Sequence, residues 1–395
     1  MTSSSKGPLD GVRVVDFTAN MSGPYATMLL GDQGADVIKI EPLNGDALRH
    51  VGSGSRVMSA YFANLNRSKR SVALDLTKQS ARPIVEALLD SADVVCHNFR
   101  ASVVQRLGLE GPDVRQGRPS LIYVGIGGFG KEGPYGGRPA YDHVIQALSG
   151  FAARQADLKT GQPHLVQQGV IDKTTGMMAA QAITAALFER TRTGVGREIN
   201  IQMLDVAVSF LWPDGMMDYT MVDAPSEVRP DISKSFRLST TKDGHVSFAL
   251  VQAGLWSTLA KAVGIDPFDA SSMSARAEVL RTVGRTLDAM TTKEAVAFLT
   301  AQNVAVSEVV ALADVAEHAQ VIANDTLDTF THSALGTVRQ PNPVARFDDR
   351  RAGDLREAPE LGQHSREVLT ELGLSASVDD LIRDGVLVGP SDSSL

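Results

Sequence analysis

Asp172 is the residue whose setting in the sequence offers the clearest chemistry. It stands in VIDKTTGMMAAQ, directly after a short apolar segment. A long helix of small residues is predicted to follow over residues 173–191. From this spacing alone, the side chain is expected to cap the helix by accepting hydrogen bonds from unpaired backbone N–H groups. A carboxylate held ionised at a helix N-terminus can also attack an activated acyl carbonyl, with the same amides stabilising the oxyanion. The two roles are compatible.

Two sets of basic and polar residues accompany the third and fourth predicted strands. The first set is Asn66, Arg67, Ser68, Lys69 and Arg70, and the second is Asn98, Phe99, Arg100 and Arg106. Both sets fall at connections of an open α/β sheet, where ligands of such sheets bind. Cationic side chains there suit a polyphosphorylated ligand, and an aromatic ring suits a purine. Taken singly, each charge is explained as well by a solvated turn, and Phe99 by the core.

The sequence lacks the motifs of three other kinds of site, namely dinucleotide-binding, metal and serine hydrolase sites. The first strand–turn–helix carries only Gly23 and Gly31, so the G-x-G-x-x-G of dinucleotide binding is absent and Glu41 is interpreted as a solvated strand end. The eight histidines show no metal-ligand spacing, so no metal site is expected. Ser53, in GSGS, lacks the strand-to-helix context of a hydrolase nucleophile.

Charge and cysteine content narrow the class of protein further. The 395 residues include 38 basic and 46 acidic side chains, and the resulting formal charge of −8 disfavours a nucleic-acid partner. The single cysteine, Cys96, cannot form an internal disulfide, which favours a reducing compartment. Residues 174–188 form an uncharged stretch, yet it is shorter than the roughly 20 residues that cross a bilayer. The sequence therefore predicts a cytoplasmic protein with no membrane association.

The elements that must position these residues alternate between strand and helix. Strands are predicted at residues 12–17, 36–41, 71–76, 93–99 and 121–126, with helices between them. This rhythm indicates βαβ units, and hence an α/β fold with a large, doubly wound, Rossmann-like domain and a parallel sheet. A loop dense in glycine and proline follows at residues 127–139 and leads into an apolar helix.

The pattern changes near residue 236, where short strands and four helical patterns predict a smaller α+β domain. The expected division is a large domain over residues 1–225, a small domain over 226–340 and a return segment over 341–395. Polar linkers at 225–235 and 339–354 are expected to flank the small domain.

Six segments in order along the chain carry a family resemblance. They are LDGVRVVDFT with GPYATMLLGDQGADVIKIE, NRSKRSVALDL, VVCHNF with RLGL, GPYGGRPAYDHVIQA, DKTTGMMAAQAITAALFERTRTGVGREINIQMLD and PELGQHSREVLTELG. With these segments the chain resembles the family III CoA-transferases of the CaiB/BaiF type, which include formyl-CoA and carnitine CoA-transferases and α-methylacyl-CoA racemases. The resemblance implies an interlocked homodimer that uses acyl-CoA and a carboxylic acid acceptor, without a tightly bound cofactor.

The resemblance also implies roles for individual residues. The nucleophilic aspartate of the family falls on Asp172, which would form an acyl anhydride and then a thioester with CoA. The family's contacts to CoA fall on Lys69, Asn98, Phe99 and Arg106.

Three positions depart from the pattern of the family. Pro42 stands where many relatives have an arginine, and residues 249–254 (ALVQAG) are not glycine-rich, so formate and oxalate are not predicted as substrates. Tyr141 replaces the histidine of the racemases, with His143 two residues on and expected on another helix face. A tyrosine with an ordinary pKa near 10 is a poor base for an α-proton.

Transfer of CoA is therefore favoured, with Tyr141 expected to line the acyl or thioester pocket unless it is a core aromatic. An α-methylacyl-CoA racemase is the first alternative. A non-catalytic CoA or nucleotide binder is the second.

Overall fold

The computed structural model describes residues 7–157, 159–223, 236–352 and 356–389. The chain divides into two compact units, one made of residues 1–213 and 325–395 and the other of residues 214–324. The second unit thus begins and ends earlier than the small domain expected over 226–340. The linker expected at 225–235 lies outside the described residues.

The first unit is built on a seven-stranded sheet in the order β14-β3-β2-β1-β4-β5-β6. The strands are β1 (Arg13–Asp16), β2 (Asp36–Glu41), β3 (Lys69–Leu74), β4 (Val94–His97), β5 (Ile122–Gly127), β6 (Glu198–Gln202) and β14 (Leu387–Val388). All neighbouring strands are parallel except β14, which pairs with β3 in the antiparallel sense. The predicted α/β class with a mainly parallel sheet is confirmed.

Hydrophobic cores lie on both faces of this sheet. Successive residues of a strand point to opposite faces, so Val14 joins one buried cluster and Val15 the other. The helices of this unit are α1 (Ser22–Gly31), α2 (Ala60–Asn66), α3 (Arg82–Ser91), α4 (Ala101–Leu107), α5 (Gly111–Arg115), α6 (Asp142–Ser149), α7 (Phe151–Arg154), α8 (Val170–Thr193), α9 (Met203–Gly215), α14 (Ser365–Glu371) and α15 (Val378–Arg383).

Strand order reverses at β1. This strand pairs with β2 on one side and with β4 on the other, so the chain winds outward in opposite directions from it. At such a point the loops that follow the two central strands diverge and leave a crevice at the carboxyl ends of the strands. The loops after β1 and β4 therefore lie at the position where sheets of this kind commonly bind ligands.

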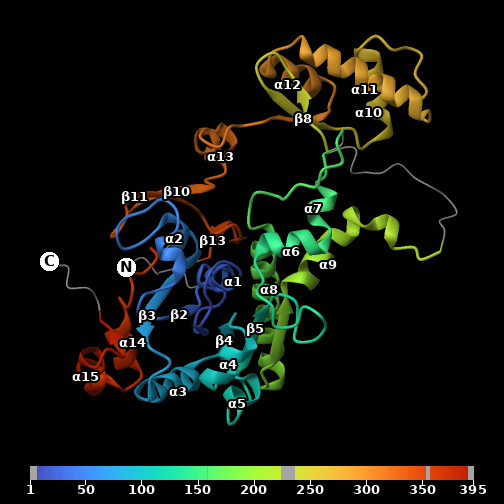
Figure 1. The fold of residues 1–395 in the computed structure, drawn as a ribbon. Helices are drawn as coiled ribbons and strands as arrows, with labels where there is room; N and C mark the ends of the chain where they lie inside the picture. The colour runs from blue at the N-terminus through green and yellow to red at the C-terminus, as the bar shows by residue number, and fades with distance from the viewer. Residues whose placement is uncertain (1–6, 158, 224–235, 353–355, 390–395) are drawn as a thin grey trace. The chain divides into compact units, whose positions relative to one another are not determined.

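Helices α1 and α8 pack closely against each other (Figure 1). Gly176 makes this approach possible, because a Cβ atom at this position would lie 2.7 Å from the backbone oxygen of Ser22. The contact joins the first turn of α1 to the second turn of α8. It brings the N-terminus of α1 to the region of α8 that contains Asp172.

Residues 325–351 form two small antiparallel pairs within the first unit. The pairs are β10 (Leu327–His332) with β11 (Gly336–Pro341), and β12 (Arg346–Phe347) with β13 (Arg350–Arg351). The linker expected over residues 339–354 is therefore wrong where backbone pairing occupies it, at residues 339–341, 346–347 and 350–351.

The second unit has its own core. An antiparallel sheet of β7 (Ser239–Thr240), β8 (His245–Ala249) and β9 (Ala305–Glu308) packs with α10 (Ala253–Ala262), α11 (Met273–Asp288) and α12 (Thr292–Ala301). The short helix α13 (Ala319–Ala323) follows. These elements match the α+β pattern expected from the sequence.

Candidate active site

Asp16 fixes the start of the loop between β1 and α1. One carboxylate oxygen accepts hydrogen bonds from the backbone N–H and the hydroxyl of Thr18, at 2.8 and 2.5 Å. The other accepts from Thr27 Oγ1 at 2.7 Å and from Lys69 Nζ at 3.0 Å. Burial alone would raise the pKa of Asp16, but the charges of Lys69 and Lys39 outweigh it and lower the pKa to about 2.

A second buried ion pair holds the middle of the same loop. Lys39 Nζ donates to the carbonyl oxygen of Thr18 at 2.8 Å and to Asp46 Oδ2 at 3.1 Å. Asp46 Oδ1 accepts from the backbone N–H of Asn20 at 3.4 Å. The loop is therefore hydrogen bonded to two buried side chains of opposite charge that form an ion pair with each other.

Asn98 holds the loop from the side of β4. Its side-chain oxygen accepts from the N–H of Ala19 at 2.9 Å, and its amide nitrogen donates to the carbonyl of Ala19 at 2.7 Å. The next residue, Asn20, has φ of 63°, a conformation rare for residues other than glycine. Together these contacts determine where the chain enters α1 and hence where Ser22 lies.

Asp172 is the third residue of α8. Hydrogen bonds from Ser22, through its side chain and its backbone, reach the Asp172 carboxylate. The expectation that Asp172 caps the helix is wrong, because the N-cap is Gly169 and lacks a side-chain cap. The backbone N–H groups of Ile171 and Asp172 instead donate to Asp142 Oδ2, at 2.7 and 2.9 Å.

The surroundings of Asp172 disfavour its charged form. Burial raises the pKa of this carboxyl, the negative charge of Asp142 raises it further, and the hydrogen bonds from Ser22 lower it. The result is a pKa of about 6. At neutral pH the group is mostly ionised, and its basicity exceeds that of an ordinary aspartate, as suits a nucleophile.

Two tyrosines, Tyr61 and Tyr141, differ in their relation to this site. Burial and the charges of Asp172 and Asp142 raise the pKa of Tyr61, a residue of α2 that the sequence patterns did not single out. Tyr141 precedes α6, is 56% exposed and stacks on His143 with ring centroids 6.3 Å apart. The exposure excludes a core role for Tyr141 in the first unit. The two rings do not face apart as expected, because Tyr141 has extended backbone geometry at the N-cap.

Comparison with known proteins identifies the family of this chain. The sequence model of CoA-transferase family III matches residues 9–365. The chain belongs to this family.

Relatives of the family with curated names are CoA-transferases. The chain is 32% identical to succinyl-CoA:mesaconate CoA-transferase of Haloarcula hispanica over 399 residues, which cover 96% of this chain and 100% of that protein. It is 40% identical to the probable fatty acyl-CoA transferase Rv3272 of Mycobacterium tuberculosis over 210 residues, 52% of this chain and 53% of that protein. The crystal structure of Rv3272 matches with a TM-score of 0.80 and 30% identity, covering 92% of this chain and 100% of that one.

The residues that the family resemblance assigned to CoA differ in their accessibility. Lys69 is buried, and its ammonium group donates to Asp16, to the carbonyl of Pro24 and to Asn66. Burial lowers the pKa of Lys69 to about 8, against the opposing charge of Asp16. This placement differs from the expected contact with CoA, because the ammonium group has no exposed surface in the structure.

Asn98 and Phe99 follow β4 at the carboxyl edge of the sheet, whereas Arg106 lies at the far end of α4, the next helix. Phe99 packs partly into the core and stacks on His97 with ring centroids 6.0 Å apart. Burial lowers the pKa of His97 to about 4, so the imidazole is neutral and hydrogen bonded to Tyr123 at 2.8 Å. Arg106, in the last turn of α4, is exposed and forms no ion pair within the described parts of the chain.

Glu41 is not the solvated strand end that the sequence suggested. It is 2% exposed, accepts two hydrogen bonds from Arg49 at 2.8 and 2.7 Å, and accepts one from Ser71 at 2.7 Å. The guanidinium of Arg49 thus neutralises a carboxylate next to Pro42. Burial would raise the pKa of Glu41, but the bonds and charge of Arg49 lower it.

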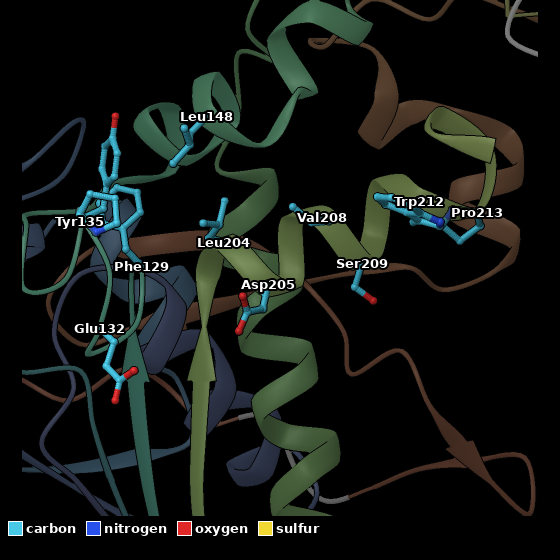
Figure 2. A pocket seen from close by; sticks show the side chains of 11 residues that line it. Phe129, Glu132, Tyr135, Leu148, Leu204, Asp205, Val208, Ser209, Trp212 and Pro213 are labelled. Carbon is cyan, nitrogen blue, oxygen red and sulfur yellow. The ribbon is translucent and has the colours of Figure 1, made fainter. Parts of the chain in front are cut away.

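A separate apolar cleft of about 1030 Å³ lies in the first unit, between α6, α9 and the loop after β5 (Figure 2). It is lined by Phe129, Glu132, Pro134, Tyr135, Leu148, Leu204, Asp205, Val208, Ser209, Trp212 and Pro213. Its charged residues, Glu132 and Asp205, are both acidic. The cleft therefore does not suit the phosphates of CoA.

The described residues contain neither a cluster of metal ligands nor a helix that could span a membrane. No group of three or more histidine, cysteine, aspartate or glutamate residues there is placed to hold a metal ion. None of the helices in those ranges combines the length and apolarity needed to span a membrane.

Proposed function

We propose that this chain transfers CoA from an acyl-CoA to a carboxylic acid, with Asp172 as the covalent nucleophile. The observation that carries the proposal is the carboxylate of Asp172 itself. It lies in the first turn of α8, is hydrogen bonded to Ser22, and has a pKa of about 6. The charge that acts on it comes from Asp142 and is negative, so the group is not neutralised by a cation.

The reaction begins with attack of an Asp172 oxygen on the thioester carbonyl. The carbon–sulfur bond breaks, CoA leaves as a thiolate, and an acyl-aspartyl anhydride remains. The thiolate then attacks the carbonyl carbon of Asp172, releasing the donor as a free carboxylate and leaving a thioester between Asp172 and CoA. Each intermediate keeps an activated acyl group, so no external energy source is required.

The second half repeats these steps in reverse order. The acceptor carboxylate attacks the thioester carbonyl of Asp172, forming a second anhydride and freeing the CoA thiolate. Attack of this thiolate on the acceptor carbonyl gives the new acyl-CoA and restores the Asp172 carboxylate. Ser22, already hydrogen bonded to Asp172, supplies donors that can stabilise the developing oxyanions.

Asn98, Phe99 and Arg106 are the residues proposed to contact CoA. Asn98 and Phe99 directly follow β4, beside the point where the strand order of the sheet reverses, and Arg106 lies in the last turn of α4, the next helix. The exposed guanidinium of Arg106 suits a phosphate group. Lys69 is left out of this set because its ammonium group is bonded within the fold.

The substrates are proposed by class, as an acyl-CoA donor and a carboxylic acid acceptor, with no tightly bound cofactor. Exposed Tyr141 is proposed to line the acyl pocket. A homodimer of interlocked chains is proposed from the family resemblance.

The decisive experiment traps the covalent intermediate. The protein is incubated with a panel of acyl-CoAs, and intact-mass analysis followed by peptide mapping locates any bound CoA. We expect one CoA thioester on Asp172, no adduct in Asp172→Asn, and an unchanged adduct in the control Asp113→Asn, which alters an exposed aspartate of α5.

Three results would contradict the proposal. An adduct on another residue refutes the assignment of the nucleophile. Exchange of the substrate α-proton with solvent deuterium, without CoA transfer, indicates the racemase. Tight CoA binding that Asp172→Asn leaves unchanged, with no turnover of any substrate, indicates a non-catalytic binder.

A further inference from the structure

The N-terminus of α8 is completed by a residue from another helix. Gly169 occupies the N-cap position and has no side chain with which to bind the free N–H groups. Asp142, the first residue of α6, fills this role, because its Oδ2 accepts from both Ile171 and Asp172. The backbone of the proposed nucleophile is thus hydrogen bonded directly to a second carboxylate.

The carboxylate of Asp142 is itself held in place. Its Oδ1 accepts a hydrogen bond of 2.5 Å from Gln146 Nε2, one turn further along α6. Gln146 also donates to the carbonyls of Val166 and Gln168, at 3.1 and 3.3 Å, and accepts from the N–H of Val166 at 2.9 Å. Asp142 and Gln146 are 9% and 1% exposed. Together they fix the chain that leads into α8.

The charges around Asp172 come from several packed elements. The carboxyl group of Asp142 of α6 accepts from the backbone of Asp172 at 2.9 Å, and the charges of both aspartates act on Tyr61 of α2. Ser22 of α1 contributes hydrogen bonds without a charge. Lys173, the neighbour in the sequence, bonds instead to Gln168 at 3.1 Å on the exposed side. The negative charge of Asp142 is therefore the main charge acting on Asp172.

This repulsion distinguishes the states of the proposed reaction. The free carboxylate of Asp172 carries a negative charge beside Asp142, whereas its anhydride and its thioester are uncharged. Like charges held close together destabilise the ionised state of one partner. Formation of either covalent state removes that repulsion.

We propose that Asp142 is a positioning residue that orients the backbone of Asp172 and, through its charge, favours the covalently loaded states of Asp172 over the free carboxylate. This inference rests on the proposed function, since it assigns a cause to the readiness of Asp172 to accept an acyl group. Gln146 supports it by fixing the side chain of Asp142.

The test replaces Asp142 by asparagine, which keeps an oxygen for the two N–H groups and removes the charge. At a fixed concentration of acyl-CoA, we expect the fraction of enzyme carrying CoA on Asp172 to fall about tenfold, the effect of roughly one pKa unit. The acid limb of kcat/KM, which reports ionisation of the free enzyme, is expected to move to lower pH by about one unit. Loss of kcat with an unmoved acid limb and an unchanged loaded fraction would overturn the proposal.

Two further variants separate charge from structure. Gln146→Ala keeps the charge of Asp142 but releases its side chain, so kcat should fall while the acid limb stays within about 0.3 units. If Asp142→Asn does not fold, as judged by circular dichroism, Asp142→Ser offers a capping oxygen without charge and should give the same shift.

Titration of Asp172 in the absence of substrate tests the role of Asp142 separately from the proposed function. NMR of carboxyl-labelled aspartate, with Asp172→Asn used to assign the signal, measures the pKa of Asp172 without any substrate. A pKa that falls in Asp142→Asn supports the action of the Asp142 charge on Asp172 even if no CoA adduct is ever found, a result that would refute the proposed function. An unchanged pKa refutes the role of Asp142 even if Asp172 carries CoA.

Discussion

Asp16 and Asp172 are two aspartates of the same α/β unit with opposite electrostatic environments. Asp16 is completely buried, yet its pKa is about 2, because Lys69 and Lys39 lie close to it. Asp172 is less buried, yet its pKa is about 6, because burial raises it and the negative charge of Asp142 adds to that rise instead of opposing it. Burial opposes ionisation of both groups, so the sign of the neighbouring charge decides the outcome.

The comparison separates a structural carboxylate from the proposed nucleophile. Asp16 uses its charge to hold the loop after β1, with every bond directed at Thr18, Thr27 or Lys69. Within the described residues no cation offsets the charge of Asp172, which costs stability and supports its proposed role as the nucleophile. Three experiments test this difference, in order of decreasing effect on stability, and a fourth, with the smallest effect, tests the proposed CoA site.

The largest effect is expected from Asp16→Asn. The substitution leaves the buried ammonium of Lys69 without its counter-charge, and breaking a buried ion pair in this way costs about 3–5 kcal/mol. Urea denaturation at pH 7 measures the loss, and Asp113→Asn serves as the exposed control. A loss below about 1 kcal/mol would show that Asp16 does not depend on charge compensation.

The same change at Asp172 is expected to have the opposite sign. Because the pKa of Asp172 rises from 3.8 unfolded to about 6 folded, its ionisation disfavours folding above pH 6. Asp172→Asn should therefore stabilise the fold by roughly 2–3 kcal/mol at pH 7 while it abolishes CoA transfer. The gain should disappear as the pH falls to about 4. Destabilisation at pH 7 would contradict the assigned environment.

Acid titration of stability is expected to reveal Asp16. Its pKa falls from 3.8 in the unfolded chain to about 2 in the fold, so its contribution is complete above pH 4. We expect roughly 2 kcal/mol to be lost as the pH falls from about 4 to 2. Denaturation curves of the wild type and Asp16→Asn should converge over this interval. Curves that stay parallel would exclude Asp16 as the titrating group.

The smallest effect on stability is expected from Arg106→Gln. Arg106 is exposed and, within the described residues, forms no ion pair, so unfolding should change by less than about 0.5 kcal/mol. Binding of CoA should weaken by about fivefold, and the difference should shrink with added salt, as for an exposed charge contact. Isothermal titration calorimetry measures the affinity for CoA and its dependence on salt, and urea denaturation measures the change in stability. Unchanged affinity would remove Arg106 from the proposed CoA site.

Local patterns in the sequence were sufficient for much of the fold. Runs such as VRVVDF and DVIKIE contain β1 and β2, and alternation of strands with helices predicted the parallel sheet. The position of Asp172 in the first turn of a long helix was also close to correct. These features depend on periodicity and on neighbours within a few residues, so they can be read along the chain.

Contacts between distant residues were not predictable in this way. Glu41 and Lys69 look like surface charges in the sequence. In the structure both are buried, Glu41 in an ion pair with Arg49 and Lys69 in an ion pair with Asp16. The end of the second unit was misplaced because β10 and β11 pair with each other inside the first unit.

The sequence by itself determined the α/β class, the family and the aspartate at the start of α8. Only the tertiary structure decided what surrounds that aspartate, because Asp142 lies 30 residues away and reaches it through the packing of α6 against the start of α8. Electrostatic interactions depend on distance in space, and a linear pattern of residue types does not contain that distance.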